Sequence, residues 1–284
     1  MKIESILVLY KRSTYQHYQE ERVSPCPDPG EFARFKETHD RHYETLAKVE
    51  NILNQHRLHY EKSERGKKLD YDRFKLIITV GGDGTFFEAA RQVRNQFILG
   101  VNSDPQWSVG RFCTATQENF DSILSALLED RPHITNRNRL KITSKHTKHT
   151  VHFINDILVC HANPASLSRY VLCIGNDAEE QRSSGVWIST AAGSTGALHS
   201  AGGQILAAES SDFQYMPREL YAGWSGGHYH LRGGVLPQDT PMHITSLMQD
   251  GVVFIDGSHE CMPFPASEEI QVTSSEFPLK VLHL

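Results

Sequence analysis

The stretch Gly81–Thr85 (Gly-Gly-Asp-Gly-Thr) combines three glycines with one carboxylate, a composition suited to phosphate chemistry. Glycines can adopt positive φ and admit a ligand close to the backbone, and the free amides that open a helix bind phosphate. An acid in this position repels phosphate unless it binds Mg²⁺ or accepts a proton, and both roles belong to phosphoryl transfer. The stretch therefore predicts a phosphate site around Asp83, in preference to a tight turn in which Asp83 only caps a helix.

A second group of residues could bind a nucleoside. Asn155 and Asp156 stand at the start of a predicted strand, where they can accept hydrogen bonds from ribose hydroxyls or an adenine amino group. The alternative is that Asp156 is a turn residue. The loop 189–196 (Ser-Thr-Ala-Ala-Gly-Ser-Thr-Gly) has small side chains that permit a flat group to lie against the backbone. Close packing of a helix on a strand is its alternative.

Several basic residues are candidates for phosphate contact. Lys11 and Arg12 follow the apolar run Ile3–Tyr10, and ligands of open α/β sheets gather at the carboxyl ends of strands. A solvated basic turn explains these two residues equally well. For Arg111 and the pair Asn138-Arg139, solvation at the surface is the favoured interpretation.

The elements that position these residues alternate between strands and helices in the first half of the chain. This alternation predicts a doubly wound, parallel α/β domain over residues 1–135. Its expected strands are Ile3–Tyr10, a short strand beginning at Leu58–Tyr60, Leu76–Val80 and Phe97–Val101; its expected helices lie within Glu31–His59, Phe86–Asn95 and Asn119–Glu129. The stretch Val23–Gly30 holds three prolines and is expected to be irregular.

Residues 136–284 are predicted to form a β-rich domain, because strand-like segments follow one another from Leu140 onward. One helix is expected, from Ser194 to about Ala208. The stretch Gly223–Gly234 is loop-like, and the C-terminal end of the chain can return to the first domain. The expected strands are Leu140–Thr143, Thr150–Phe153, Asp156–Cys160, Tyr170–Ile174, Val186–Ser189, His243–Leu247, Val252–Ile255, Ile270–Thr273 and Leu279–Leu282.

Composition excludes several classes of protein. The 284 residues carry a net charge of −5, which argues against a nucleic-acid or anionic-membrane partner. The apolar runs are of strand length, well short of the roughly 20 residues of a membrane span. The five cysteines include no C-x-x-C pair, which favours free thiols in a reducing compartment. With no signal peptide visible at Met1, the sequence predicts a cytoplasmic protein.

Taken together and in this order, these motifs resemble the NAD kinase family, and most closely its mitochondrial type. The resemblance covers nearly the whole chain. The motifs that carry it are Gly81–Thr85, Asn155-Asp156, Ser189–Thr195, Ser200–Gly203, Lys11–Tyr15, Gly100–Pro105, Arg182–Gly185 and Val253–Gly257.

The resemblance implies ATP-dependent phosphorylation of the 2′-hydroxyl of the adenosine ribose of NAD or NADH, with Mg²⁺ held mainly through the nucleotide phosphates. It implies that Asp83 is the general base. It further implies a homodimer or higher homo-oligomer. The residues assigned to ATP or phosphate are Gly81, Gly82, Gly84, Thr85 and Lys11, and those assigned to NAD are Asn102, Asn155, Asp156, Thr190, Gly193, Ser194 and Thr195.

The chain departs from the common bacterial pattern of this family. That pattern has a proline, a threonine and a tyrosine where this chain has Ala191, Ala192 and Ala197, and an acid where it has Ser184. Loss of the aromatic removes a stacking surface worth about 1 kcal/mol. The difference concerns recognition of the base and leaves the phosphoryl chemistry at Asp83 unchanged.

Two other functions are alternatives to an NAD kinase. A lipid or sphingoid-base kinase shares the Gly-Gly-Asp-Gly motif, although the polar pair Asn155-Asp156 argues against it. A non-catalytic sensor of NADP(H) or another dinucleotide is favoured by the altered loop. A zinc site at His146, His149 and His152 is disfavoured, because on a strand His149 faces away from the other two.

Overall fold

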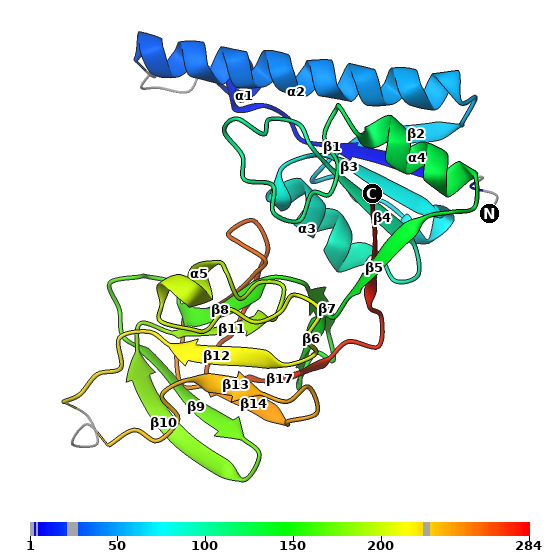
Figure 1. Ribbon diagram of the computed structural model, residues 1–284. Coiled ribbons are helices and arrows are strands. Elements are labelled where there is room, and N and C mark those ends of the chain that lie inside the picture. Colours follow the sequence, from blue (N-terminus) through cyan, green and yellow to red (C-terminus); the bar gives the residue numbers. More distant parts are fainter. Residues whose placement is uncertain (1–2, 4, 22–27, 224–227) are drawn as a thin grey trace. The chain divides into compact units, whose positions relative to one another are not determined.

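The computed structural model describes residues 3, 5–21, 28–223 and 228–284 (Figure 1). The chain divides into two compact units, residues 1–136 with 279–284, and residues 137–278. Parts of the expected irregular stretch Val23–Gly30 and of the expected loop Gly223–Gly234, together with Cys26, lie outside the described residues. No helix within the described ranges is both long and apolar enough to cross a membrane.

Unit 1 contains a six-stranded sheet with the order β2-β1-β3-β4-β18-β5. β1 pairs in parallel with β2 and β3, β3 with β4, and β4 with β18. The predicted parallel α/β fold is therefore confirmed. The strands are β1 (Ile6–Tyr10), β2 (Tyr60–Glu64), β3 (Leu76–Gly81), β4 (Phe97–Asn102), β5 (His133–Arg137) and β18 (Leu279–His283).

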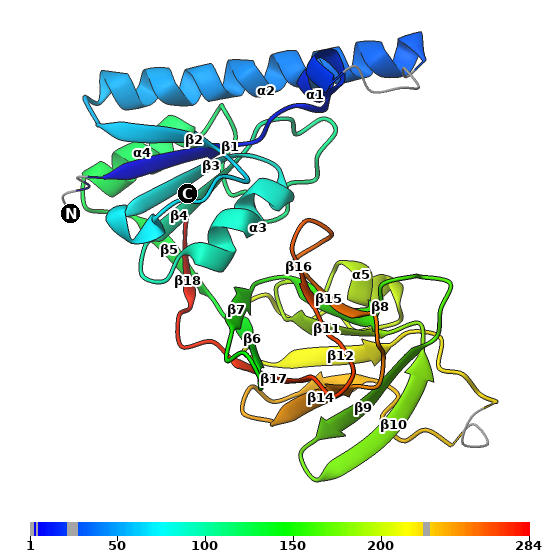
Figure 2. The ribbon, with the colours of Figure 1, turned by 180° about the vertical axis from the view of Figure 1, so that it is seen from behind.

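Helices cover both faces of this sheet. α2 (Pro29–Gln55) and α4 (Phe120–Leu128) lie on one face and α3 (Asp83–Gln92) on the other (Figures 1 and 2). α2 begins at Pro29 because the Asp28 side chain accepts hydrogen bonds from the Gly30 and Glu31 amides. α1 (Thr14–Glu21), which was not predicted, packs on α2 through aromatic pairs, and a short 3₁₀ helix spans Tyr71–Arg73.

Unit 2 consists of two six-stranded sheets, with the orders β10-β9-β14-β17-β6-β7 and β13-β12-β11-β8-β15-β16. The pairings between these strands are antiparallel, and one hydrophobic core joins the inner faces of both sheets. The strands are β6 (Leu140–Ser144), β7 (Thr150–Phe153), β8 (Asp156–His161), β9 (Ser168–Ile174), β10 (Asp177–Ser183), β11 (Val186–Thr190), β12 (Phe213–Pro217), β13 (Gly234–Leu236), β14 (Met242–Ser246), β15 (Gly251–Ile255), β16 (Cys261–Pro263) and β17 (Glu269–Ser274).

The helix expected from Ser194 to about Ala208 is wrong, because α5 spans only Ala197–Ser200. Gly202 follows it with φ of 99°, and side chains then hold the chain in a non-helical path. The Leu206 amide donates to Ser194 Oγ, and the Gln204 amide donates to Gln214 Oε1. A helix of four residues is too short to provide an anion site at its N-terminus.

The polar edge strand β10 (Asp177–Ser183) was not predicted from the sequence. β10 has the sequence Asp-Ala-Glu-Glu-Gln-Arg-Ser, pairs with β9, and is an edge strand of its sheet among the described residues. A strand at the edge of a sheet needs few apolar residues, so its sequence lacks the pattern that predicts a strand.

Candidate active site

In unit 1 the predicted phosphate motif forms the connection between a buried strand and a helix. β3 is buried along its whole length, Gly82 is the N-cap of α3, and Asp83 is the first helical residue. Among the described residues no side chain caps this helix, and the Thr85 amide donates to the Gly82 carbonyl at 3.0 Å. The amides of Asp83 and Gly84 are therefore the ones that an anion can use. The turn therefore has the arrangement that phosphate binding requires.

The glycines of this turn are needed for close packing rather than for positive φ. None of Gly81, Gly82 and Gly84 lies among the positive-φ residues of the described chain. A Cβ at Gly81 would lie 2.4 Å from Thr85 Oγ1, and one at Gly82 would lie 2.6 Å from Ser108 Oγ. These glycines thus do not use the positive φ that is open to them, and at Gly81 and Gly82 a neighbouring side chain fills the space of a Cβ.

Asp83 is held by a loop from another part of unit 1. Its carboxylate accepts hydrogen bonds from the backbone amides of Arg111, at 3.0 Å, and Phe112, at 2.8 Å. The helix-cap alternative is therefore wrong, because these donors do not belong to α3. A carboxylate offers about four lone-pair positions, so two remain for a substrate hydroxyl or a cation.

The loop that holds Asp83 is itself organised by Asn102, at the end of β4. The Asn102 amide group donates from Nδ2 to Ser108 O at 2.9 Å, and its Oδ1 accepts from the Asp104 amide at 3.1 Å. A Cβ at Gly110 would lie 2.2 Å from Asn102 Nδ2. The Asn102 side chain thus fixes the loop backbone through these two hydrogen bonds.

A buried histidine connects Lys11 to the same loop. His42 Nε2 lies 2.8 Å from the carbonyl of Lys11, so this nitrogen carries the proton, and Nδ1 accepts from Ser103 Oγ at 2.8 Å. Burial, and then the charge of Lys11, lower the pKa of His42 to about 4, which keeps it neutral at pH 7. Burial also lowers the pKa of Lys11, with Asp104 acting in the opposite direction.

Arg65 is a residue that the sequence analysis missed. It follows β2, and a Cβ at Gly84 would lie 3.2 Å from its Nη1. Its charge also acts on Lys11. Unit 1 therefore places two cations, Lys11 and Arg65, beside the glycine turn. The position of Arg65 directly after a parallel strand was the available signal. The Arg111 side chain, in contrast, is exposed, and it is the Arg111 amide that contacts Asp83.

In unit 2, Asn155 and Asp156 lie where the chain enters β8. Asp156 is buried, and burial, followed by the negative charge of Asp256, raises its pKa to about 7. Gly196 lies beside the side chains of Asn155 and Asp156. A Cβ at Gly196 would lie 3.7 Å from Asn155 Oδ1 and 3.7 Å from Asp156 Oδ2. The structure thus brings the pair together with the small-residue loop.

The polar residues of that loop mainly bind the protein's own backbone. Thr190 Oγ1 donates to the carbonyl of Ile154 at 2.5 Å and accepts from the Gly193 amide at 3.1 Å. Ser194 is buried and accepts from the Leu206 amide, whereas Thr195 is half-buried. These contacts fix the loop against the residue pair.

Gly193 has no room for a side chain. A Cβ there would lie 2.1 Å from the Asn155 carbonyl oxygen and 2.6 Å from its carbon. These are backbone atoms, which cannot move aside as a flexible side chain can. The structure therefore supports close packing as the reason for this glycine.

Ala197, where the bacterial pattern has a tyrosine, borders a hollow of about 460 Å³. Trp187 and Arg218 also line it, and the guanidinium of Arg218 lies 5.9 Å from the centre of the Trp187 ring. A planar aromatic surface is thus present beside the loop, supplied by β11 rather than by α5.

Arg139 is buried, contrary to the expectation of surface solvation. Its Nε donates to the carbonyl of Phe277 at 2.7 Å. Burial lowers the pKa of Arg139 to about 10, while Asp256 and Glu276 act in the opposite direction. The residue is therefore part of the interior of unit 2.

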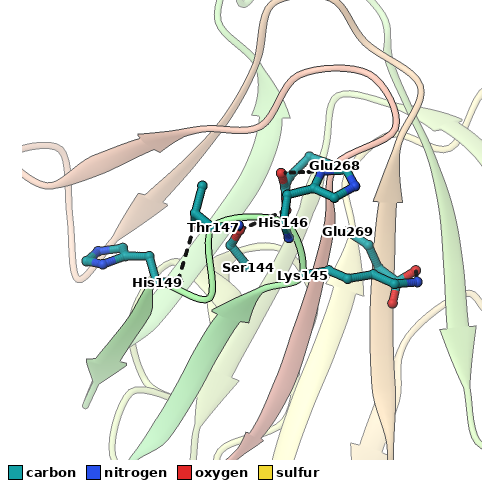
Figure 3. Close-up of polar contacts among 7 residues, drawn as sticks. All are labelled: Ser144, Lys145, His146, Thr147, His149, Glu268 and Glu269. Atoms are coloured by element: carbon teal, nitrogen blue, oxygen red, sulfur yellow. Dashed lines mark hydrogen bonds and ion pairs between the residues drawn. The ribbon is translucent and has the colours of Figure 1, made fainter.

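The three spaced histidines have separate partners. Figure 3 shows His146 and His149 on the turn between β6 and β7, with His146 directed toward Glu268. His146 Nδ1 lies 2.9 Å from Glu268 Oε2, and His152 Nδ1 lies 2.9 Å from Ser275 Oγ. The assumption that all three lie on a strand was wrong, because two belong to the turn.

Over the described ranges, no group of three or more His, Cys, Asp or Glu side chains could hold a metal ion. Mg²⁺ that accompanies a nucleotide needs only one or two carboxylates, because phosphates and water complete its octahedron. Asp83 has lone pairs left after its two amide contacts. The residues present therefore fit Mg²⁺ that arrives with nucleotide phosphates.

Comparison with known proteins identifies both halves of the chain. A model of the ATP-NAD kinase N-terminal domain matches residues 19–132, and a model of the ATP-NAD kinase C-terminal domain matches residues 154–284. A probable NADH kinase of Oryza sativa subsp. japonica is 30% identical over 264 residues, which cover 85% of this chain and 81% of that protein. An NAD kinase of Aquifex aeolicus (strain VF5) is 30% identical over 189 residues, covering 62% of this chain and 66% of that protein.

Two solved structures share the fold. The crystal structure of an NAD kinase from Archaeoglobus fulgidus in complex with ATP has a TM-score of 0.71 and 21% identity, covering 98% of this chain and 92% of that one. Yeast NADH kinase complexed with NADH has a TM-score of 0.74 and 14% identity, covering 100% of this chain and 84% of that one.

Proposed function

Because the chain belongs to the ATP-NAD kinase family, we propose that it phosphorylates NAD or NADH at the 2′-hydroxyl of the adenosine ribose, with ATP as donor. The observation that carries the proposal is the turn Gly81–Thr85. It combines open helix amides with a carboxylate that a separate loop aims and holds. The protein is in this view a phosphotransferase.

Asp83 acts as the general base. It accepts the proton of the 2′-hydroxyl as that oxygen attacks the γ-phosphorus, and the bond from phosphorus to the β,γ-bridging oxygen breaks. The amides of Arg111 and Phe112 keep the carboxylate in one orientation, so that its remaining lone pairs face the reacting oxygen. This arrangement supports a role in which Asp83 moves a proton at a fixed position.

The triphosphate is bound by the first amides of α3, together with Lys11 and Arg65. Helix amides contribute partial positive charge, and the two side chains contribute full charges beside the turn. His42, through the carbonyl of Lys11, keeps the lysine backbone in place. When bound, Mg²⁺ neutralises charge on the triphosphate, and Asp83 is the residue that would contact it.

The acceptor dinucleotide is bound by Asn155 and Asp156. In its ionised form Asp156 accepts hydrogen bonds from ribose hydroxyls, and the Asn155 side chain borders the same space near Gly196. The loop with Thr190, Gly193, Ser194 and Thr195 supports this pair through its backbone contacts. We further propose a cytoplasmic homo-oligomer, which light scattering and cell fractionation test.

The experiment is the formation of NADP⁺ from NAD⁺ and Mg-ATP by the full chain, with NADH and a sphingoid base as parallel acceptors. We expect phosphorylation of NAD⁺ or NADH and none of the lipid. Binding of NAD without turnover would favour the sensor alternative. Phosphorylation of the lipid alone would favour the lipid kinase.

A further inference from the structure

Asp256, at the end of β15, holds the entry to β8 from the neighbouring strand. Its Oδ1 accepts from the Asn155 amide at 2.7 Å, and its two oxygens lie 3.2 and 3.3 Å from the Ile154 amide. In return, its own amide donates to the carbonyl of Asp156 at 2.8 Å. Asp256 therefore contacts the backbone on both sides of the predicted NAD-binding pair.

The conformation of Asp256 is unusual for a residue with a side chain. Its φ is 50°, in the left-handed region that Asp and Asn tolerate better than other non-glycine residues. The residue is 5% exposed, so its carboxylate is almost fully withdrawn from water. A buried acid in a strained conformation indicates a specific role for this side chain.

Arg139 supplies the opposite charge. It is 2% exposed, and Asp256 and Glu276 are the two acids whose charges act on it. Its hydrogen bond to the carbonyl of Phe277 anchors the guanidinium. A buried carboxylate needs hydrogen bonds and a compensating charge. The two amides supply the hydrogen bonds of Asp256, and the charge of the buried Arg139 acts on it from within the same unit.

The charge of Asp256 also affects the pKa of Asp156. Asp156 is 4% exposed, and Asp256 is the second cause, after burial, that raises its pKa to about 7. The Asn155 side chain acts in the opposite direction through a hydrogen bond. The two acids are thus coupled both through the backbone and through their charges.

We propose that Asp256, with Arg139 as its buried counter-ion, is a positioning residue for Asn155 and Asp156, and so for the acceptor dinucleotide. This inference rests on the proposed function, because it assigns NAD to that pair. Asp256 does not itself contact the substrate. It acts by fixing the backbone of the pair.

The test is Asp256→Asn in the full chain. Asparagine tolerates the left-handed φ and can still accept the Asn155 amide, so we expect a folded protein. The matched control is Glu276→Gln. Glu276 is the other acid whose charge acts on Arg139, but its side chain is exposed and pairs with Lys141. The readouts are KM for NAD and for ATP between pH 6 and 8.5, and calorimetric NAD affinity.

At pH 8.5, where Asp156 is ionised in both proteins, Asp256→Asn should weaken NAD binding about tenfold, since a charge-assisted hydrogen bond becomes a neutral one. KM for ATP should stay within about twofold. In the wild type, KM for NAD should rise as pH falls below about 7, the pKa of Asp156. In Asp256→Asn this rise should begin at lower pH, because the charge that raises the pKa is absent.

An unchanged NAD affinity and pH profile in Asp256→Asn would overturn the proposal, as would equal effects from Glu276→Gln. Equal increases in both KM values would show a merely structural role. If Asp256→Asn fails to fold, Arg139→Lys is tested in its place. Equal weakening of ATP and NAD binding in Arg139→Lys would contradict the proposal. The kinase assay of the wild type tests the proposed function separately, because calorimetry measures NAD affinity even without turnover.

Discussion

Replacing Asp83 with asparagine tests the base directly, and the structure shows that the change has two consequences. Asparagine cannot take the proton of the 2′-hydroxyl, so kcat should fall by roughly two to four powers of ten. This corresponds to about 3–5 kcal/mol of activation free energy. NAD and ATP should still bind.

The second consequence concerns stability. The carboxylate accepts two amides, from Arg111 and Phe112, whereas asparagine has one acceptor oxygen and an NH₂ group that would face the other amide. Loss of one hydrogen bond to a charged acceptor costs about 1.5–3 kcal/mol. The melting temperature should therefore fall by roughly 5 °C, as expected for a domain of this size.

The assay is NADP⁺ formation at 25 °C, with a melting curve and calorimetric NAD and ATP affinities for the same preparation. Arg41→Gln is the matched control, since Arg41 Nε binds Asp104 Oδ1 at 2.8 Å and anchors the same loop without touching Asp83. It should lose comparable stability but keep kcat within about tenfold. A near-normal kcat in Asp83→Asn would refute the role of Asp83 as base. If kcat fell equally in Arg41→Gln, the loss of activity would be due to disruption of the loop and not to loss of the base.

Asp156→Ala should raise KM for NAD more than KM for ATP, because the pair is assigned to the acceptor; if steady-state kinetics showed the ATP constant moving instead, donor and acceptor sites would have to be exchanged. Gly193→Ala should lower the melting temperature by several degrees or prevent folding, since its Cβ would lie 2.1 Å from the Asn155 carbonyl oxygen; a wild-type melting curve would contradict the packing argument. His42 has a pKa of about 4 when folded and about 6.5 when unfolded. The unfolded chain therefore binds the proton first, and the stability of the wild type relative to His42→Gln should fall by up to about 3 kcal/mol as pH drops from 6.5 to 4; urea unfolding at a series of pH values measures it, and a constant difference would refute the burial argument.

The sequence alone determined the first four parallel strands of unit 1 and the turn at Asp83. Runs such as Leu76–Val80 are almost entirely apolar on both faces, with Thr79 as the one polar residue. This pattern is local, since a strand covered by helices on both sides needs mostly apolar residues along its length. The glycines and the acid of the turn are likewise adjacent in the chain. For the same reason the NAD kinase resemblance was visible, because its motifs are short and lie in a given order.

Only the tertiary structure decided what surrounds these motifs. His42 and Asp256 reach their sites from elements distant in the sequence, and no local pattern distinguishes them from ordinary polar residues. Arg139 resembled a surface residue because burial of a charge depends on a partner that is more than a hundred positions away. Gly193 could be understood only once the Asn155 carbonyl was placed beside it. Local spacing determines which backbone forms, whereas the charge, exposure and packing of a side chain depend on the segments that the fold brings next to it.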